Sequence, residues 1–134
     1  MSEVLFAPLA YTRYEANQTL PEKFTRLLKR SGLAERLKGK TVAIKMHVGA
    51  GISYSTIPPV FVRKLVDFVK QSGGDCFITD HYVYGRHPEQ RGYTENNLGC
   101  PVLDDCGYLN KYFYPKEVSY RTFRHVDVAG LIHD

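Results

Sequence analysis

The middle third of the chain alternates between strand-like and helix-like patterns of apolar residues. Residues 42–46 are apolar except for Lys45 and do not alternate strictly, which predicts a strand buried on both faces. Residues 58–71 predict an amphipathic helix that ends at a glycine pair, and residues 76–79 predict the next strand. The apolar stripe of this helix consists of Phe61, Leu65 and Phe68 or Val69. Strand, helix and strand in this order predict a βαβ unit with parallel strands.

The N-terminal part predicts an edge strand and a capped helix. Residues 4–9 are apolar, but Pro8 argues against a central strand. Thr19 and Glu22 have the spacing of a capping box, and the helix that they begin should stop at Gly32. Its buried face should contain Phe24, Leu27 and Leu28, with Glu22, Lys23, Arg26, Lys29 and Arg30 outside it. Residues 33–40 predict one further helical turn.

The patterns weaken beyond the second strand. Residues 82–106 are polar and contain glycines, so we expect a long functional loop or lid with a short helix near 93–98. Residues 118–123 alternate as an exposed strand would. Residues 125–134 contain more apolar residues again, although two histidines and two aspartates lie among them. They predict either a final docked element or a chain that is the N-terminal part of a longer protein.

Together these patterns predict a single α/β domain over residues 1–134, with a mostly parallel sheet, flanking helices and a Rossmann-like βαβ core. The 134 residues are 43% apolar and 24% charged, which is typical of a globular chain. They include no apolar run of about 18 residues and no signal-peptide pattern. We therefore expect no membrane contact and a cytoplasmic location.

Charge and cysteine content narrow the ligand classes. The net charge of +4 favours an anionic small molecule, and it is too small and too dispersed for a nucleic-acid footprint. Cys76, Cys100 and Cys106 lack the close pairs that zinc and iron–sulfur sites need. Reduced thiols are the simpler prediction.

The predicted topology gathers candidate chemistry at one edge of the sheet. Ligands of open parallel sheets bind beyond the carboxyl ends of the strands, where loops and helix N-termini meet. Ser55, Thr56, His87 and Arg91 are expected near that edge. The candidate ligand-binding residues are Lys45, His47, Gly49, Gly51, Ser53 and Arg86, and the candidate ligands of a divalent metal are His47, Asp80 and His81.

Each candidate has a plainer structural interpretation. Lys45 could extend its amine from the strand end into water, and His47 could bond a neighbouring carbonyl. The Gly-Ala-Gly segment at 49–51 matches neither a P-loop nor the full dinucleotide fingerprint. Asp80 and His81 are adjacent, so they face one site only if the chain turns there.

The segment "VAIKMHVGAG", followed by "IPPVFVRKLVDFVKQSGGDCFITD", resembles domain-of-unknown-function family 362, a family of uncharacterised iron–sulfur centre proteins. The resemblance covers nearly the whole chain and is closest over residues 42–80. It implies an α/β fold, and the motif positions it singles out are Lys45, His47, Gly49, Thr79 and Asp80.

The chain also departs from that family. Members usually continue into a second half, and many carry a ferredoxin-like segment whose closely spaced cysteines are absent here. We therefore expect no iron–sulfur cluster on this chain. Many members have an acidic residue where Ala50 and Gly51 stand, which weakens a metal role based on that acid.

Two hypotheses follow, and neither decides whether the protein is an enzyme. In the first, the domain binds a ligand or metal: Lys45 neutralises an anion, His47 binds metal or moves a proton, and Asp80 orients it or joins the metal shell. In the second, the chain is a non-catalytic interaction module. It would complete its fold with a partner chain or as a homo-oligomer, through the C-terminal segment 125–134 and the tyrosine-rich segment 108–115.

Overall fold

The computed structural model describes residues 4–49, 55–81, 87–106 and 112–133. Its centre is the predicted βαβ unit, in which strand β1 (Thr41–Lys45) and strand β2 (Asp75–His81) flank helix α3 (Pro59–Gln71). The two strands are parallel, and Thr41 lies beside Asp75 and Lys45 beside Thr79. The mixed α/β class and the parallel pairing are therefore confirmed.

A third parallel strand extends the sheet where the sequence predicted a loop. Strand β3 (Val102–Cys106) pairs with β2, with Val102 beside Ile78, so the strand order is β1-β2-β3. Before it lie a 3-10 turn, η2 (Pro88–Arg91), and the predicted short helix, α4 (Glu95–Leu98). The loop prediction over 82–106 was wrong for β3, because a five-residue strand with two aspartates has a weak apolar pattern.

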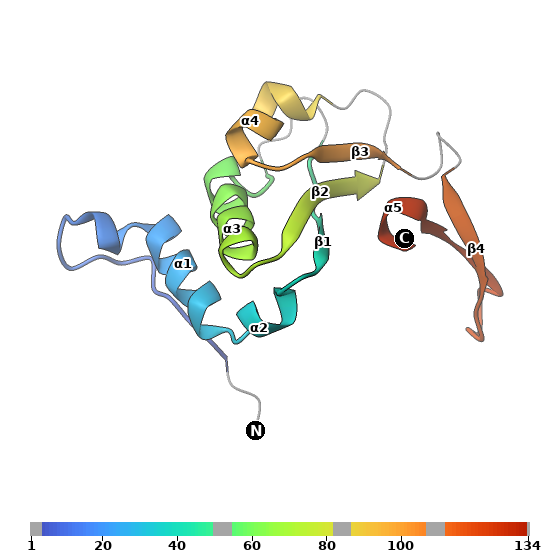
Figure 1. Cartoon of the computed structure of the whole chain (residues 1–134), viewed down its shortest axis with the longest axis horizontal. Coiled ribbons are helices and arrows are strands. Elements are labelled where there is room, and N and C mark those ends of the chain that lie inside the picture. Colours follow the sequence, from blue (N-terminus) through green and yellow to red (C-terminus); the bar gives the residue numbers. More distant parts are fainter. Residues whose placement is uncertain (1–3, 50–54, 82–86, 107–111, 134) are drawn as a thin grey trace.

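Helices α3 and α4 pack on the sheet, and helix α1 (Leu20–Arg30) packs behind α3 (Figure 1). The predicted further turn is α2 (Ala34–Leu37). The contacts between α1 and α3 include a ring pair, Phe24 and Phe61 at 5.8 Å edge to face, and an ion pair in which Lys64 Nζ lies 2.6 Å from Glu22 Oε1. None of the helices in the described ranges is long and apolar enough to cross a bilayer.

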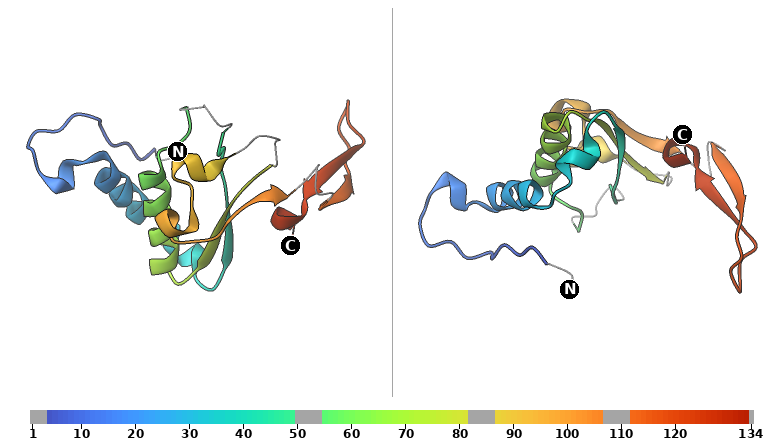
Figure 2. Two further views of the ribbon diagram at one scale, coloured as in Figure 1. Left: turned by 90° about the horizontal axis from the view of Figure 1, so that it is seen from above. Right: turned by 60° about the horizontal axis from the view of Figure 1, so that its bottom comes forward.

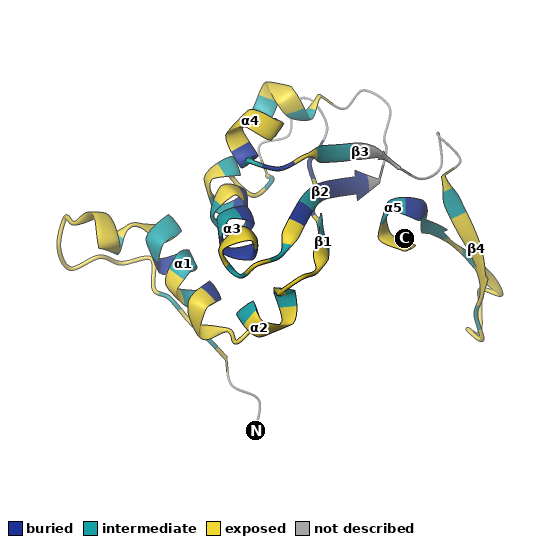
Figure 3. Cartoon of the chain, in the orientation of Figure 1, coloured by how far each residue is buried: buried dark blue, intermediate teal, exposed yellow. Residues whose placement is uncertain are grey.

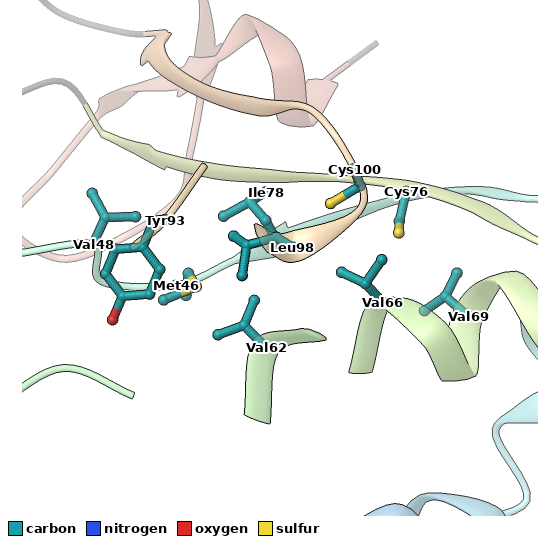
Figure 4. Close-up of a cluster of buried hydrophobic side chains, with 10 residues drawn as sticks. All are labelled: Met46, Val48, Val62, Val66, Val69, Cys76, Ile78, Tyr93, Leu98 and Cys100. Carbon is teal, nitrogen blue, oxygen red and sulfur yellow. The ribbon is translucent and has the colours of Figure 1, made fainter. Parts of the chain in front are cut away.

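The core lies between α3, α4 and the sheet (Figure 4), where Tyr93 and Val48 sit at one end and the two cysteines at the other. It is formed by Met46, Val48, Val62, Val66, Val69, Cys76, Ile78, Tyr93, Leu98 and Cys100. The predicted stripe on α3 is thus shifted by one residue, except at Val69. The reason is that α3 is covered on two sides, and Phe61 faces α1 instead of the sheet.

The N-terminal segment differs from its prediction. Residues 4–9 form no strand in the structure, and the capping box is not made, since Thr19 Oγ1 donates to the carbonyl of Ala16 within the 3-10 turn η1 (Ala16–Gln18). Lys23 was expected in water but is buried. Its amine finds acceptors in the carbonyls of Pro8 and Ala10, which explains how a lysine can lie there.

The C-terminal segment forms an antiparallel hairpin of β4 (Phe113–Glu117) and β5 (His125–Ala129), followed by α5 (Gly130–His133). The strand prediction at 118–123 was wrong, because these residues form the connection between β4 and β5. Alternating apolar and polar residues in an exposed segment do not determine which residues pair. The hairpin and the N-terminal segment lie at opposite ends of the molecule (Figure 2). Both are largely exposed, whereas buried residues gather on α3 and β2 (Figure 3).

Candidate functional site

The ends of β1 and β2 bring Lys45 and Asp80 together. The parallel register sets Lys45 beside Thr79, one residue before Asp80. Lys45 Nζ then donates to Asp80 Oδ1 over 2.7 Å. Two residues that lie 35 positions apart in the chain thus meet at the edge of the sheet where ligands of such folds bind.

Asp80 is the buried centre of this cluster. Its side chain is only 4% exposed, and its second oxygen, Oδ2, accepts a hydrogen bond of 3.0 Å from the backbone N–H of Val48. The same oxygen lies 3.6 Å from His47 Nδ1. A buried carboxylate requires partners of this kind. Asp80 therefore fixes the lysine, and it also fixes the backbone at the point where β1 gives way to the loop.

The cationic groups of the cluster face water. The side chains of Lys45 and His47 are 51% and 68% exposed, in contrast to the buried carboxylate that holds them. Lys45 Nζ has three N–H donors: one bonds Asp80, and a second makes a long contact of 3.5 Å with the carbonyl of Met46. The groups that a ligand can reach are therefore the amine of Lys45 and the imidazole of His47, which lie beside the buried carboxylate of Asp80.

Arg91 and Gly49 shape the next part of the site. Gly49 has a φ of +74°, and a Cβ there would overlap the guanidinium group of Arg91. That guanidinium donates to the carbonyl of Val48 and, over 2.9 Å, to Thr56 Oγ1. Arg91 therefore crosses the glycine and links the two ends of the loop between β1 and α3. The group that lies close to Gly49 is a side chain of the protein, and a ligand-binding role of Gly49 stays a prediction.

Tyr93 is a structural member of the site that the sequence analysis missed. Its ring is buried, its hydroxyl lies 2.8 Å from Thr56 Oγ1 and 2.5 Å from the carbonyl of Ile57, and Arg91 lies over its face at 5.3 Å. The only sequence feature that marks Tyr93 is its position after Arg-Gly. That feature does not reveal its partner Thr56, which lies 37 residues away.

The remaining candidates divide into two groups. Gly51, Ser53 and Arg86 lie outside the described residues, and of His81 only the backbone, at the end of β2, is described. His87 is placed, and its Nδ1 lies 3.2 Å from Glu89 Oε1 on an exposed surface. His87 therefore contacts Glu89 of the adjacent turn η2.

The described residues contain no group of three histidine, cysteine or carboxylate side chains that could hold a metal ion. His47 and Asp80 supply two donors, and the side chain of the third candidate, His81, is not described. The metal ligand set therefore stays a prediction.

Two cysteines with described side chains lie away from the site. Cys76, near the start of β2, and Cys100, just before β3, are both buried and not in disulfides. Burial raises the pKa of the Cys76 thiol, and burial together with the neighbouring Cys76 raises the pKa of Cys100 to about 12. These two thiols form no disulfide, which agrees with the prediction of reduced cysteines, and both lie in the core.

A scan against protein-family models, a search of curated proteins and a search of solved structures each found no match. The resemblance to family 362 therefore stays a prediction. Lys45, His47 and Asp80, which that resemblance singles out, do lie together at the ends of β1 and β2.

Proposed function

We propose that this edge of the sheet binds a small anion, a phosphate or carboxylate group of a ligand, between Lys45 and His47. One observation carries the proposal. The buried Asp80 uses both oxygens inside the protein, on Lys45 Nζ and on the Val48 N–H, while the two nitrogen-bearing side chains beside it face water. The carboxylate of Asp80 thereby holds nitrogen-bearing side chains in place at the surface.

The charges near the loop support an anion over a cation. Lys45 and Arg91 carry two positive charges against the single negative charge of Asp80, before any charge on His47 is counted. Because Asp80 already fixes the lysine, an arriving anion need not order that side chain, which lowers the entropic cost of binding. Lys45 would neutralise the anion, and His47 would donate a hydrogen bond to it.

The test is a titration with inorganic phosphate at constant ionic strength, followed by the backbone amide signal of Val48 in NMR spectra. We expect saturable binding with a Kd of about 1 mM, as suits a small ion with two or three contacts. Lys45→Met should weaken binding at least about tenfold. Lys40→Met is the matched control, because Lys40 is exposed just before the opposite end of β1, and it should leave binding unchanged.

Two results would overturn the anion site. One is a shift that does not saturate. The other is an equal loss in Lys45→Met and Lys40→Met, which would show that phosphate responds to overall charge. His47→Ala completes the set, and a smaller loss than in Lys45→Met is expected, since its imidazole is the more exposed group.

A divalent metal is the second ligand class for the same residues, because His47 Nδ1 and Asp80 Oδ2 lie 3.6 Å apart. Elemental analysis of the purified protein beside His47→Ala tests it. Near-stoichiometric metal that is lost in the variant, but kept in Lys45→Met, would replace the anion proposal. A metal-free protein that still binds phosphate would support the anion.

A different observation favours an interaction module. The β4–β5 hairpin exposes Tyr120 and Phe123 at its connection and Ile132 on α5, and isolated two-stranded hairpins are only marginally stable in water. The proposal is that a partner chain or second copy covers this hairpin. Hydrogen exchange over a dilution series tests the second copy: protection of the amides of Val126 and Val128 should rise with protein concentration.

A further inference from the structure

The N-terminal arm, residues 4–15, begins with a strand-like sequence at residues 4–9 and is largely exposed, with no helix or strand in the structure. Val4, Phe6 and Leu9 are 85%, 81% and 76% exposed. Their segment is the one whose pattern predicts an edge strand, yet in the described part of the chain it pairs with no strand. Large apolar side chains on an unpaired extended segment are typical of a strand that adds to another sheet.

The arm is held along the outside of α1 (Figure 2). Lys23 of α1 donates to the carbonyls of Pro8, over 2.9 Å, and Ala10, over 2.5 Å. This anchor fixes the arm at its middle and leaves residues 4–7 beyond it. Pro8, which lacks an N–H, would interrupt a central strand but suits a strand at an edge.

Strand β1 offers the matching surface. It lies at one end of the order β1-β2-β3, so one of its sides has no strand neighbour among the described residues. Met46 N–H donates to the carbonyl of Thr79, and the carbonyl of Lys40 accepts from Asp75 N–H. Even-numbered residues thus bond β2, and because bonding alternates along a strand, Ala43 and its odd-numbered neighbours present N–H and C=O groups to the outer side.

We propose that residues 4–9 of one chain pair with the outer edge of β1 in a second copy. An unpaired strand-like arm and an unpaired sheet edge occur in the same chain, so two copies can exchange arms and form two identical contacts in a closed, two-fold dimer. The proposal is independent of the anion site, because it uses the backbone of β1 and the apolar arm.

The experiment measures the mass of the full chain in solution over a dilution series, by light scattering and analytical ultracentrifugation. The wild type should be a dimer that dissociates on dilution. The double variant Val4→Asp/Phe6→Asp changes only exposed side chains, so it should keep its circular dichroism spectrum and weaken the dimer at least about tenfold. Tyr120→Asp, an apolar-to-acidic exchange of the same kind at the exposed hairpin connection, should leave the dimer unchanged.

A second variant tests the edge. Ala43→Pro removes one N–H from the outer side of β1 and should weaken the dimer to a similar extent. Each variant lacks one half of the contact, so an equal mixture of Val4→Asp/Phe6→Asp with Ala43→Pro should recover a weak mixed dimer through the remaining intact arm and edge.

Three outcomes would overturn the proposal: a wild type that stays monomeric at every concentration, a dimer that survives the arm variant, or a dimer that is lost in Tyr120→Asp alone. The first would leave the arm free or folded on its own chain. The last would assign the interface to the hairpin. None of them bears on phosphate binding, so the two proposals fail separately.

Discussion

Strand β2 and the N-terminal arm have similar apolar patterns and opposite surroundings. In β2, Cys76 and Ile78 are buried, with β1 on one side and β3 on the other. In the arm, Val4 and Phe6 are almost fully exposed. The comparison teaches that apolar residues with strand propensity specify an extended backbone, whereas burial requires neighbouring strands and a covering helix. The β2 segment has these within the chain, and the arm does not.

The largest predicted difference between the two regions is in thiol reactivity. Because burial raises the pKa of Cys100 to about 12, its thiolate fraction near neutral pH should be lower by about three orders of magnitude than that of an ordinary cysteine. A cysteine introduced by Leu9→Cys in the arm is the internal reference. Iodoacetamide labelling followed by peptide mapping should modify position 9 quickly and Cys76 and Cys100 only in denaturant. Fast labelling of Cys100 in the native protein would contradict its place in the core.

Truncating one side chain in each region should sharpen the contrast in stability. Ile78→Ala opens a cavity between β2 and the helices and should lower the free energy of unfolding by about 2–5 kcal/mol. Phe6→Ala removes a larger group but should cost less than about 0.5 kcal/mol in a dilute sample. Urea unfolding of the wild type and both variants measures these changes in the free energy of unfolding. A comparable loss in the two would mean that the arm is buried in solution.

Alanine substitutions at two glycines with similar φ angles allow the cost of backbone strain to be measured apart from the cost of displacing a neighbouring side chain. Gly32 and Gly49 have φ values of +71° and +74°, so alanine at either should cost about 1–2 kcal/mol in strain. At Gly32 the space is open, whereas at Gly49 a Cβ also displaces Arg91 and its hydrogen bonds, which adds about 1 kcal/mol. Thermal or urea unfolding of the two variants tests this order. Equal losses would show that Arg91 moves aside freely.

A small effect is expected at the contact between α1 and α3. The hydrogen bond and charge of Lys64 lower the pKa of Glu22, so this pair stabilises the fold above the usual glutamate pKa and loses that contribution as the pH falls through the lowered value. Both side chains are partly exposed, which limits the effect of Lys64→Met to no more than about 1 kcal/mol. Unfolding measured at neutral and acidic pH should show the difference narrowing in acid. A difference that grows in acid would contradict the sign.

The βαβ unit could be predicted from sequence because its signals are local. The apolar runs, the glycine pair after α3 and the spacing between them define two strands and a helix without reference to the rest of the chain. Strand β3 could not be predicted, since it owes its place to β2 and has a weak pattern of its own. The shifted stripe on α3 was missed for a related reason, because α1 covers the face that carries Phe61.

The candidate site was predictable in part. Lys45, His47 and Asp80 follow from the rule that the carboxyl ends of parallel strands share one edge. The roles of Arg91 and Tyr93 could not be found, because their partners, Val48, Thr56 and Ile57, lie across the fold and no sequence spacing connects them. The functions of Gly51, Ser53 and Arg86 remain predictions from the sequence.

The anchoring of the arm by Lys23 also has a consequence for proteolysis. The side chain of Arg13 is 79% exposed and lies in a bend of the arm, so the peptide bond after it is accessible to trypsin. A cut there would separate Pro8 and Ala10 from α1 in the covalent chain, so only non-covalent contacts, chiefly the two hydrogen bonds of Lys23, would retain the fragment. Once the fragment diffused away, the amine of Lys23 would lose both carbonyl acceptors and would be hydrated instead.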